Sequence, residues 1–434
     1  MEIVVIIIFV IGYLLIALEH PIKVNKAATA IITGVLCWTV YALMDSESIE
    51  HIGEQLGHHL SEIAAILFFL MGAMTIVELI DAYHGFRIIT DRITTKNAKT
   101  LLWVICWVTF FLSAILDNLT TAIVMVSLTR KLVPDKDMRL FFCGMIVIGA
   151  NAGGAWSPIG DVTTTMLWIG GQISSVNIIK TLLLPSIVCM VIPLIYLQFT
   201  LKGNLGHDKQ AAETGDYQKT HFRGSNLMFI VGICGLISVP VFKTLTHLPP
   251  YLGMLLALGV LWVISELINP EMDESEKKPY TASHALTRID VPSVLFFLGI
   301  LLAVSCLQSM EILSHFAAYL DNTIGDNRII ITLIGILSAI VDNVPLVAAS
   351  MGMYSLEAYH MDHMIWEYLA YCAGTGGSIL IIGSAAGVAV MGMEKIDFIW
   401  YLKRISLLAT LGYFAGAVVY LIIYPYLAVH PPVN

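Results

Sequence analysis

Long apolar runs separated by short polar segments fill the chain. We expect continuous spans at about 2–18, 27–44, 60–81, 176–201, 225–245, 250–268, 290–311 and 398–427. Four further apolar stretches are interrupted by polar or glycine-rich residues, at 100–132, 139–170, 327–354 and 366–394. Runs of about 17 to 25 apolar residues have the length that the core of a lipid bilayer requires. The pattern predicts an all-α polytopic membrane protein.

The amino-acid composition is that of a protein whose surface mostly contacts a lipid bilayer. The 434 residues are 57% hydrophobic and only 13% charged, whereas a soluble domain carries about 25% charged residues. No basic stripe occurs, so a nucleic-acid partner is not expected. The seven cysteines lie inside apolar segments without metal-ligand spacing, so we interpret them as small buried hydrophobic residues. We expect no bound cofactor.

The distribution of basic residues distinguishes between possible topologies. If 100–132 and 327–354 are re-entrant hairpins and both termini are periplasmic, 20 of the 23 basic residues fall in cytoplasmic loops, Lys23 and Lys26 among them. The opposite loops are acidic or neutral, and cytoplasmic loops are normally the ones rich in lysine and arginine. A single crossing by 100–132 would place the basic clusters around Arg92 and Arg139 on opposite sides. The charges therefore favour hairpins.

The two halves of the chain resemble each other. Ser-Ala-Ile-Leu-Asp-Asn at 113–118 recurs as Ser-Ala-Ile-Val-Asp-Asn at 338–343, 225 residues later. Each half would hold five spans and one hairpin, and an odd number of spans inserts the second copy upside down. We therefore predict two inverted repeats, and secondary transporters commonly have this architecture, with a substrate site where broken helices meet.

The predicted boundaries follow directly from this repeat. The first repeat covers 1–201, with the hairpin 100–132 and the broken span 139–170. A cytoplasmic linker follows at 202–224. The second repeat covers 225–434, with the hairpin 327–354 and the broken span 366–394.

Polar motifs interrupt the hairpins and the broken spans at membrane depth. Backbone that is not helical is tolerated there only inside protein or around a cavity. A desolvated Na⁺ would find hard oxygen ligands in such a cavity. The side chains of these motifs that offer oxygen are Asp117, Asn118, Asn151, Ser157, Asp161, Thr163, Asp342, Asn343 and Ser378.

Capping of the returning half-helices is the simpler explanation for these polar residues. Asn118 and Asn343 fit that role. For Asp117, Asp161 and Asp342 it is a poor account, because an ionised aspartate at the membrane centre costs about 2.5–3.5 kcal/mol. A cap contributes only about 1 kcal/mol, which a neutral side chain supplies more cheaply. We therefore interpret the three aspartates as functional.

Both the hairpin motifs and the long break Gly-Ala-Asn-Ala-Gly-Gly-Ala-Trp-Ser-Pro-Ile-Gly-Asp-Val-Thr-Thr at 149–164 resemble NhaD-type sodium/proton antiporters. These belong to a superfamily that includes dicarboxylate carriers and arsenite permeases, and the similarity runs from about residue 60 to the end. The polar positions essential in the family match Ser113, Asp117, Asn118, Asn151, Asp161, Thr163, Ser338, Asn343 and Ser378.

The resemblance implies a transporter rather than an enzyme. It implies exchange of Na⁺ or Li⁺ for H⁺, a homodimer, and a multi-pass location in a bacterial inner (cytoplasmic) membrane. We expect alternating access in which Asp117 and Asp161, with Asp342 as a further candidate, bind either H⁺ or Na⁺, and we expect Asp117 and Asp161 to ligate Na⁺. An anion carrier of the same superfamily is the nearest alternative. Dicarboxylate carriers, however, have a neutral Ser-Asn-Thr at the hairpin tips, where this chain has aspartates that would repel an anion. An intramembrane aspartyl protease is a remote alternative, because Pro158-Ile-Gly-Asp161 lacks its Gly-x-Gly-Asp signature.

The charge distribution makes a topological prediction. With the native cysteines replaced, a cysteine at Asp135 should react with impermeant thiol reagents only from the cytoplasm, and one at Ser355 only from the periplasm. Both outcomes follow if each hairpin emerges on its side of entry. Periplasmic labelling at position 135 would mean that 100–132 crosses the bilayer, and the inverted repeat would then be wrong.

Overall fold

The computed structural model describes residues 2–44, 49–93, 95, 97–200, 224–268, 273 and 277–427. No β-strand occurs in these ranges, and eight of their helices are long and apolar enough to cross a membrane. The predicted all-α polytopic class is therefore confirmed. The predicted linker at 202–224 lies outside the described residues, apart from Gly224.

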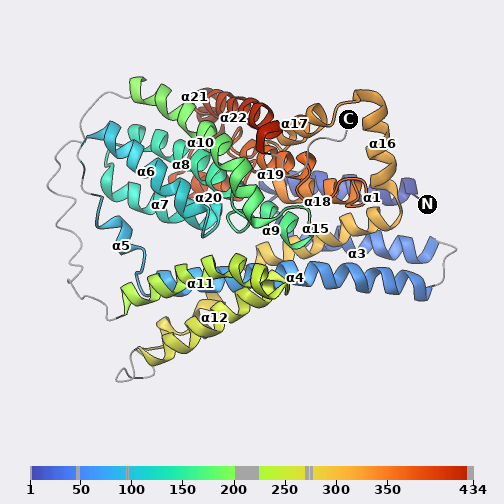
Figure 1. Cartoon of the computed structure of the whole chain (residues 1–434), viewed down its shortest axis with the longest axis horizontal. Helices are drawn as coiled ribbons and strands as arrows, with labels where there is room; N and C mark the ends of the chain where they lie inside the picture. Colours follow the sequence, from blue (N-terminus) through green and yellow to red (C-terminus); the bar gives the residue numbers. More distant parts are fainter. Residues whose placement is uncertain are drawn as a thin grey trace.

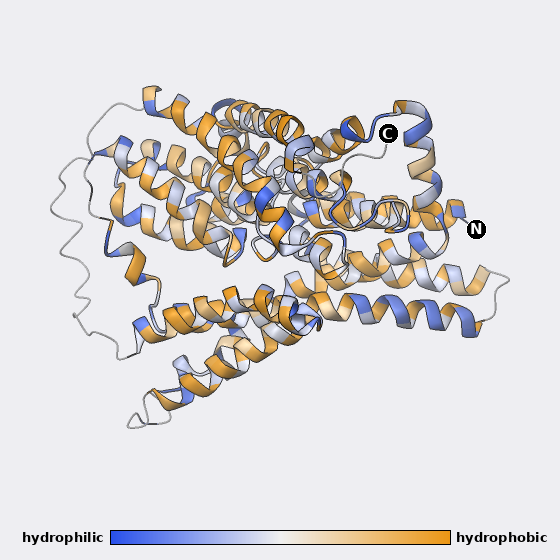
Figure 2. Ribbon diagram, viewed as in Figure 1, coloured by the Kyte–Doolittle hydropathy of each residue, from blue (hydrophilic) through white to orange (hydrophobic). Residues whose placement is uncertain are grey.

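The helices form two layers (Figure 1). The first layer consists of α1 (Glu2–Ala17), α3 (Lys26–Met44), α4 (Ile49–Ala82), α11 (Ser225–Thr246), α12 (Pro250–Leu267) and α15 (Val291–Ser309). Within it, α3 packs along α15, and α4 packs against α12 and α15. Figure 2 shows that these helices are mostly apolar, except for the hydrophilic first turns of α4.

The second layer contains the interrupted elements. It consists of α6 (Ala98–Ser113), α7 (Asn118–Leu132), α8 (Lys136–Ala155), α9 (Val162–Ile169), α10 (Ser175–Thr200), α17 (Asn327–Leu337), α18 (Asn343–Met353), α19 (Met364–Gly376), α20 (Ala385–Glu394) and α22 (Ser406–Leu427). Here α6 and α7 contact each other and both pack on α8, while α17 packs on α19 and α10 on α22.

Glycines allow the hairpins to approach the broken spans at backbone distance. A Cβ on Gly160 would lie 2.7 Å from the carbonyl oxygen of Ser113, and one on Gly383 would lie 2.6 Å from that of Ala339. Small residues at helix interfaces permit this kind of packing in membranes. An alanine at either glycine would push the hairpin tip away from the break.

Three elements differ from the predicted spans. Helix α4 begins at Ile49 instead of about residue 60 and is about 51 Å long, because no proline interrupts its polar first turns. The predicted loop after residue 311 contains α16 (Ile312–Ile324), whose Leu313 and Ala317 are buried. The predicted span 398–427 is divided at Ile405 into α21 (Phe398–Arg404) and α22.

Short helices complete the chain between these elements. They are α2 (Glu19–Ile22), α5 (Arg87–Thr90), η1 (Lys278–Tyr280) and α14 (Ala282–Arg288).

Candidate functional site

Three aspartates begin the half-helices of the second layer. Asp117 precedes α7 and accepts hydrogen bonds from the backbone N–H (2.7 Å) and the hydroxyl (2.8 Å) of Thr120. Asp161 precedes α9 and accepts from the N–H of Thr163 at 3.0 Å. Asp342 precedes α18 and accepts weakly from the N–H of Val344 at 3.4 Å. The capping role that the sequence suggested for the asparagines therefore falls on the aspartates.

Both hairpin tips converge on Asp161. The amide nitrogens of Asn118 and Asn343 donate to its Oδ2 at 3.0 Å and 3.3 Å, and Oδ1 accepts from Thr163. Only 2% of Asp161 is exposed. Three donors on a buried carboxylate satisfy much of its hydrogen-bonding capacity, and such bonds are stronger when the acceptor is charged.

Asn151 extends the network into the second broken span. Its Oδ1 accepts from Asn118 at 3.1 Å, and its amide nitrogen donates to the hydroxyls of Ser378 and Ser384, each at 2.9 Å. Both serines lie in the interruption between α19 and α20. The network therefore joins both hairpin tips to both broken spans.

Ser384 ends the polar motif at 374–384 that the sequence indicated, but it was not among the predicted site residues. It lies 223 residues after Asp161, and it caps α20 by accepting from the N–H of Gly387 at 3.2 Å, as Asp161 caps α9. The correspondence between the halves could have identified it.

Three other candidate serines contact backbone. The hydroxyls of Ser113 and Ser338 donate to the carbonyl oxygens of Ala150 (2.6 Å) and Ala373 (2.8 Å), which fixes each hairpin against a broken span. Ser157 Oγ accepts from the N–H of Ile159 at 3.4 Å. In the arrangement observed, these hydroxyls position the site's backbone.

Two buried hydroxyls near the aspartates are available as ligands. Thr163 and Thr121 are both fully buried, and within the described part of the chain neither hydroxyl has a hydrogen-bond partner. A buried polar atom without a partner is costly, and a cation bound beside the aspartates would supply these oxygens with one.

The three aspartates line one cavity between the two layers. Asn118 and Asn343 also face it, and Phe69, Met74 and Phe297 of the first layer form part of its apolar wall. The described residues contain no cluster of three or more His, Cys, Asp and Glu side chains that could hold a metal ion. The cavity lining offers carboxylate, amide and hydroxyl oxygens, from Asp117, Asn118 and Thr165 among others.

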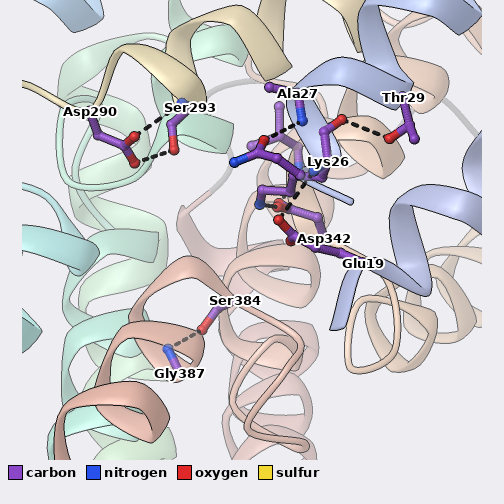
Figure 3. Close-up of polar contacts among 11 residues, drawn as sticks. Glu19, Lys26, Ala27, Thr29, Asp290, Ser293, Asp342, Ser384 and Gly387 are labelled. Carbon is purple, nitrogen blue, oxygen red and sulfur yellow. Dashed lines mark hydrogen bonds and ion pairs between the residues drawn. The ribbon is translucent and has the colours of Figure 1, made fainter. Parts of the chain in front are cut away.

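Lys26 lines the same cavity, which the sequence did not indicate. The lysine was expected in a loop, but its Nζ lies 2.9 Å from Oδ2 of Asp342, and Figure 3 shows the two side chains pointing toward each other. Lys26 and Asp342 are 316 residues apart in the sequence, so no pattern of neighbouring residues predicts that they form a pair.

Another buried carboxylate lies apart from the cavity. Glu367 of α19 is fully buried and accepts hydrogen bonds from Asn177 of α10 and, at 3.0 Å, from the Tyr420 hydroxyl of α22. It joins three helices. Sequence reasoning missed it because it stands next to the start of a predicted span.

Comparison with known proteins agrees with this geometry. Residues 13–367 match the citrate transporter family model. The chain is 51% identical to sodium/proton antiporter 1 of Arabidopsis thaliana, over 96% of this chain and 71% of that protein. It is 47% identical to sodium/proton antiporter 2 of the same plant, over 96% and 98%.

Bacterial relatives are more distant. The chain is 30% identical to the Na⁺/H⁺ antiporter NhaD of Vibrio cholerae, over 96% of this chain and 90% of that protein. These matches extend beyond the polar motifs to nearly the whole chain. The chain therefore belongs to the family of NhaD-type sodium/proton antiporters, and to the citrate transporter family whose model it matches.

Proposed function

We propose that the protein exchanges Na⁺ (or Li⁺) for H⁺ by alternating access, with the two ions competing for Asp117 and Asp161. The observation that carries the proposal is Asp161, a buried carboxylate at a helix break that receives both hairpin tips and faces a cavity. The names of the relatives, which are sodium/proton antiporters, support the same exchange.

The donor set fits a small hard cation. Carboxylate oxygens of Asp117 and Asp161, which line the cavity, would supply negative charge. The buried hydroxyl of Thr163, two residues after Asp161, would supply a neutral oxygen. In the observed arrangement Asn118 and Asn343 donate N–H groups to Asp161. Half a turn of either amide presents its oxygen instead, so the site can change from stabilising a free carboxylate to ligating Na⁺.

Competition follows from charge. A carboxylate in an apolar core is stable only when it is paired, hydrogen-bonded or neutralised. Either a proton or a Na⁺ can neutralise Asp161. Both bind to the same oxygen lone pairs, so only one of them can be bound at a time. Movement of the site between the two sides of the membrane is favoured only in a neutralised form, which links one ion's entry to the other's exit.

The cavity's charge argues against an anion as substrate. Its lining holds Asp117, Asp161 and Asp342 against Lys26, the one basic side chain among the described residues of its wall. A dicarboxylate, a citrate or an arsenite-type anion would enter a site of net negative charge. The family assignment also excludes the intramembrane protease, because the relatives are transporters.

Corresponding contacts support two inverted repeats at 1–201 and 225–434. Ser113 and Ser338 bond to carbonyls at equivalent positions, and Gly160 and Gly383 make equivalent close approaches. We extend the proposal to a homodimer in a bacterial inner membrane, with both termini periplasmic. The family resemblance supports the dimer, and the distribution of basic residues supports the orientation.

Asp161→Asn should abolish exchange without loss of expression or insertion. The change removes the charge but little volume, and the amide cannot be neutralised by H⁺ or Na⁺. We expect Na⁺-dependent proton flux in inverted vesicles to fall at least about a hundredfold, the upper range for loss of an interaction with a charged group. Flux equal to that of the unsubstituted protein would refute the proposed role of Asp161.

Asp117→Ser and Asp342→Ser recreate the neutral hairpin tips of the dicarboxylate carriers. We expect the apparent KM for Na⁺ to rise about a hundredfold in Asp117→Ser and about tenfold in Asp342→Ser. The reason for the difference is that Asp342 is already paired with Lys26, while Asp117 bonds only to neutral groups. Initial rates over a range of Na⁺ concentrations measure both values, and equal effects or tighter Na⁺ binding would contradict the assignment.

A further inference from the structure

The ion pair between Lys26 and Asp342 joins the two layers at the cavity. Lys26 is the first residue of α3 in the first layer, and Asp342 precedes α18 in the second. The side chains are only 25% and 16% exposed. In Figure 3 the lysine points toward Asp342, at the place where α3 approaches the second hairpin. The contact is therefore a largely buried charge pair within the transport cavity.

The surroundings hold the lysine in this position. Its ammonium lies 4.4 Å from the centroid of the Phe296 ring of α15, a distance suited to a cation–π interaction. Its backbone N–H donates to Oε1 of Glu19 at 3.1 Å. Asp290, at the start of α15, contributes a further negative charge nearby, and its own carboxylate is bonded to Ser293. Of these acids, only Asp342 forms an ion pair with the lysine.

The pair determines the charge that a transported cation meets. Three carboxylates line the cavity, at Asp117, Asp161 and Asp342, and Lys26 cancels one of them. Removal of one member of a buried pair leaves the other charge uncompensated, which is strongly unfavourable. An isolated ammonium would repel Na⁺, whereas an isolated carboxylate would require a proton or cation of its own.

We propose that Lys26 is a fixed counter-cation for Asp342, which limits the exchangeable charge of the cavity to Asp117 and Asp161. Lys26 is in this sense a positioning residue that sets how many mobile ions the cavity must bind before the layers rearrange. The inference rests on the proposed Na⁺/H⁺ exchange. It gives Asp342 a role as the partner of a tethered cation rather than as a Na⁺ ligand.

A double-mutant cycle in reconstituted vesicles tests the proposal, with the apparent KM for Na⁺ and the maximal rate measured for each variant. We expect Asp342→Asn to raise the KM about tenfold, because the unpaired ammonium repels Na⁺. We expect Lys26→Met to lower the maximal rate without raising the KM, because the free Asp342 carboxylate must also be neutralised in each cycle. The two single variants thus have different kinetic signatures.

The double variant Lys26→Met/Asp342→Asn restores charge balance. Its KM should return to within about threefold of the unsubstituted value. Lys26→Arg should recover most of the maximal rate that Lys26→Met loses, because it restores the positive charge. Lys23→Met is the matched control. It removes a positive charge three residues earlier in the chain, at an exposed position that does not line the cavity, so it should behave as the unsubstituted protein.

A double variant as impaired in Na⁺ binding as Asp342→Asn would overturn the proposal, because Asp342 would then act on Na⁺ directly. If the double variant does not accumulate in the membrane, the two single variants decide the question. An equal rise in KM in Lys26→Met and Asp342→Asn would indicate that the cavity's structure is disturbed rather than its charge, and would also overturn the proposal. Asp161→Asn in the same assay separates this result from the proposed exchange, since it tests that exchange without altering the pair.

Discussion

A charge buried among apolar helices must be met by hydrogen-bond donors or by an opposite charge, and the second layer is arranged to meet Asp161. Both hairpin tips supply an asparagine amide to one of its oxygens, and the start of α9 supplies a backbone N–H to the other. These donors stabilise the carboxylate without neutralising it. The site can therefore hold an anion in the core and still accept a cation.

The two halves of the chain supply the same framework but different charges. Ser113 and Ser338 hold their hairpins in equivalent ways, and Asp161 and Ser384 cap equivalent half-helices. Only the first half has an aspartate in the interruption of its broken span, at Asp161, where the second half has Ser384. At the hairpin tips both halves have aspartates, but Lys26 pairs with just one of them. The two halves therefore form a nearly symmetric framework around the site, but the charged side chains within it are distributed asymmetrically.

The sequence predicted the parts of the structure that have a local signal. Apolar length predicts the spans, and the motifs around Asp117, Asp161 and Asp342 stand out because charge is rare at membrane depth. The amphipathic helix α16 was missed although Leu313, Ala317 and Leu320 recur at helical spacing, because its polar residues resemble a loop. Pairings between distant elements, such as Lys26 with Asp342, depend on how the layers pack and have no local signature.

The central claim is that Na⁺ and H⁺ compete for one buried carboxylate site, and Na⁺ binding to the purified protein tests it most directly. Isothermal titration with Na⁺ in two buffers of different ionisation enthalpy measures both the apparent Kd and the protons released. The account predicts that Na⁺ binding releases protons and that the Kd rises as the pH falls. A Kd independent of pH, with the same heat in both buffers, would contradict it.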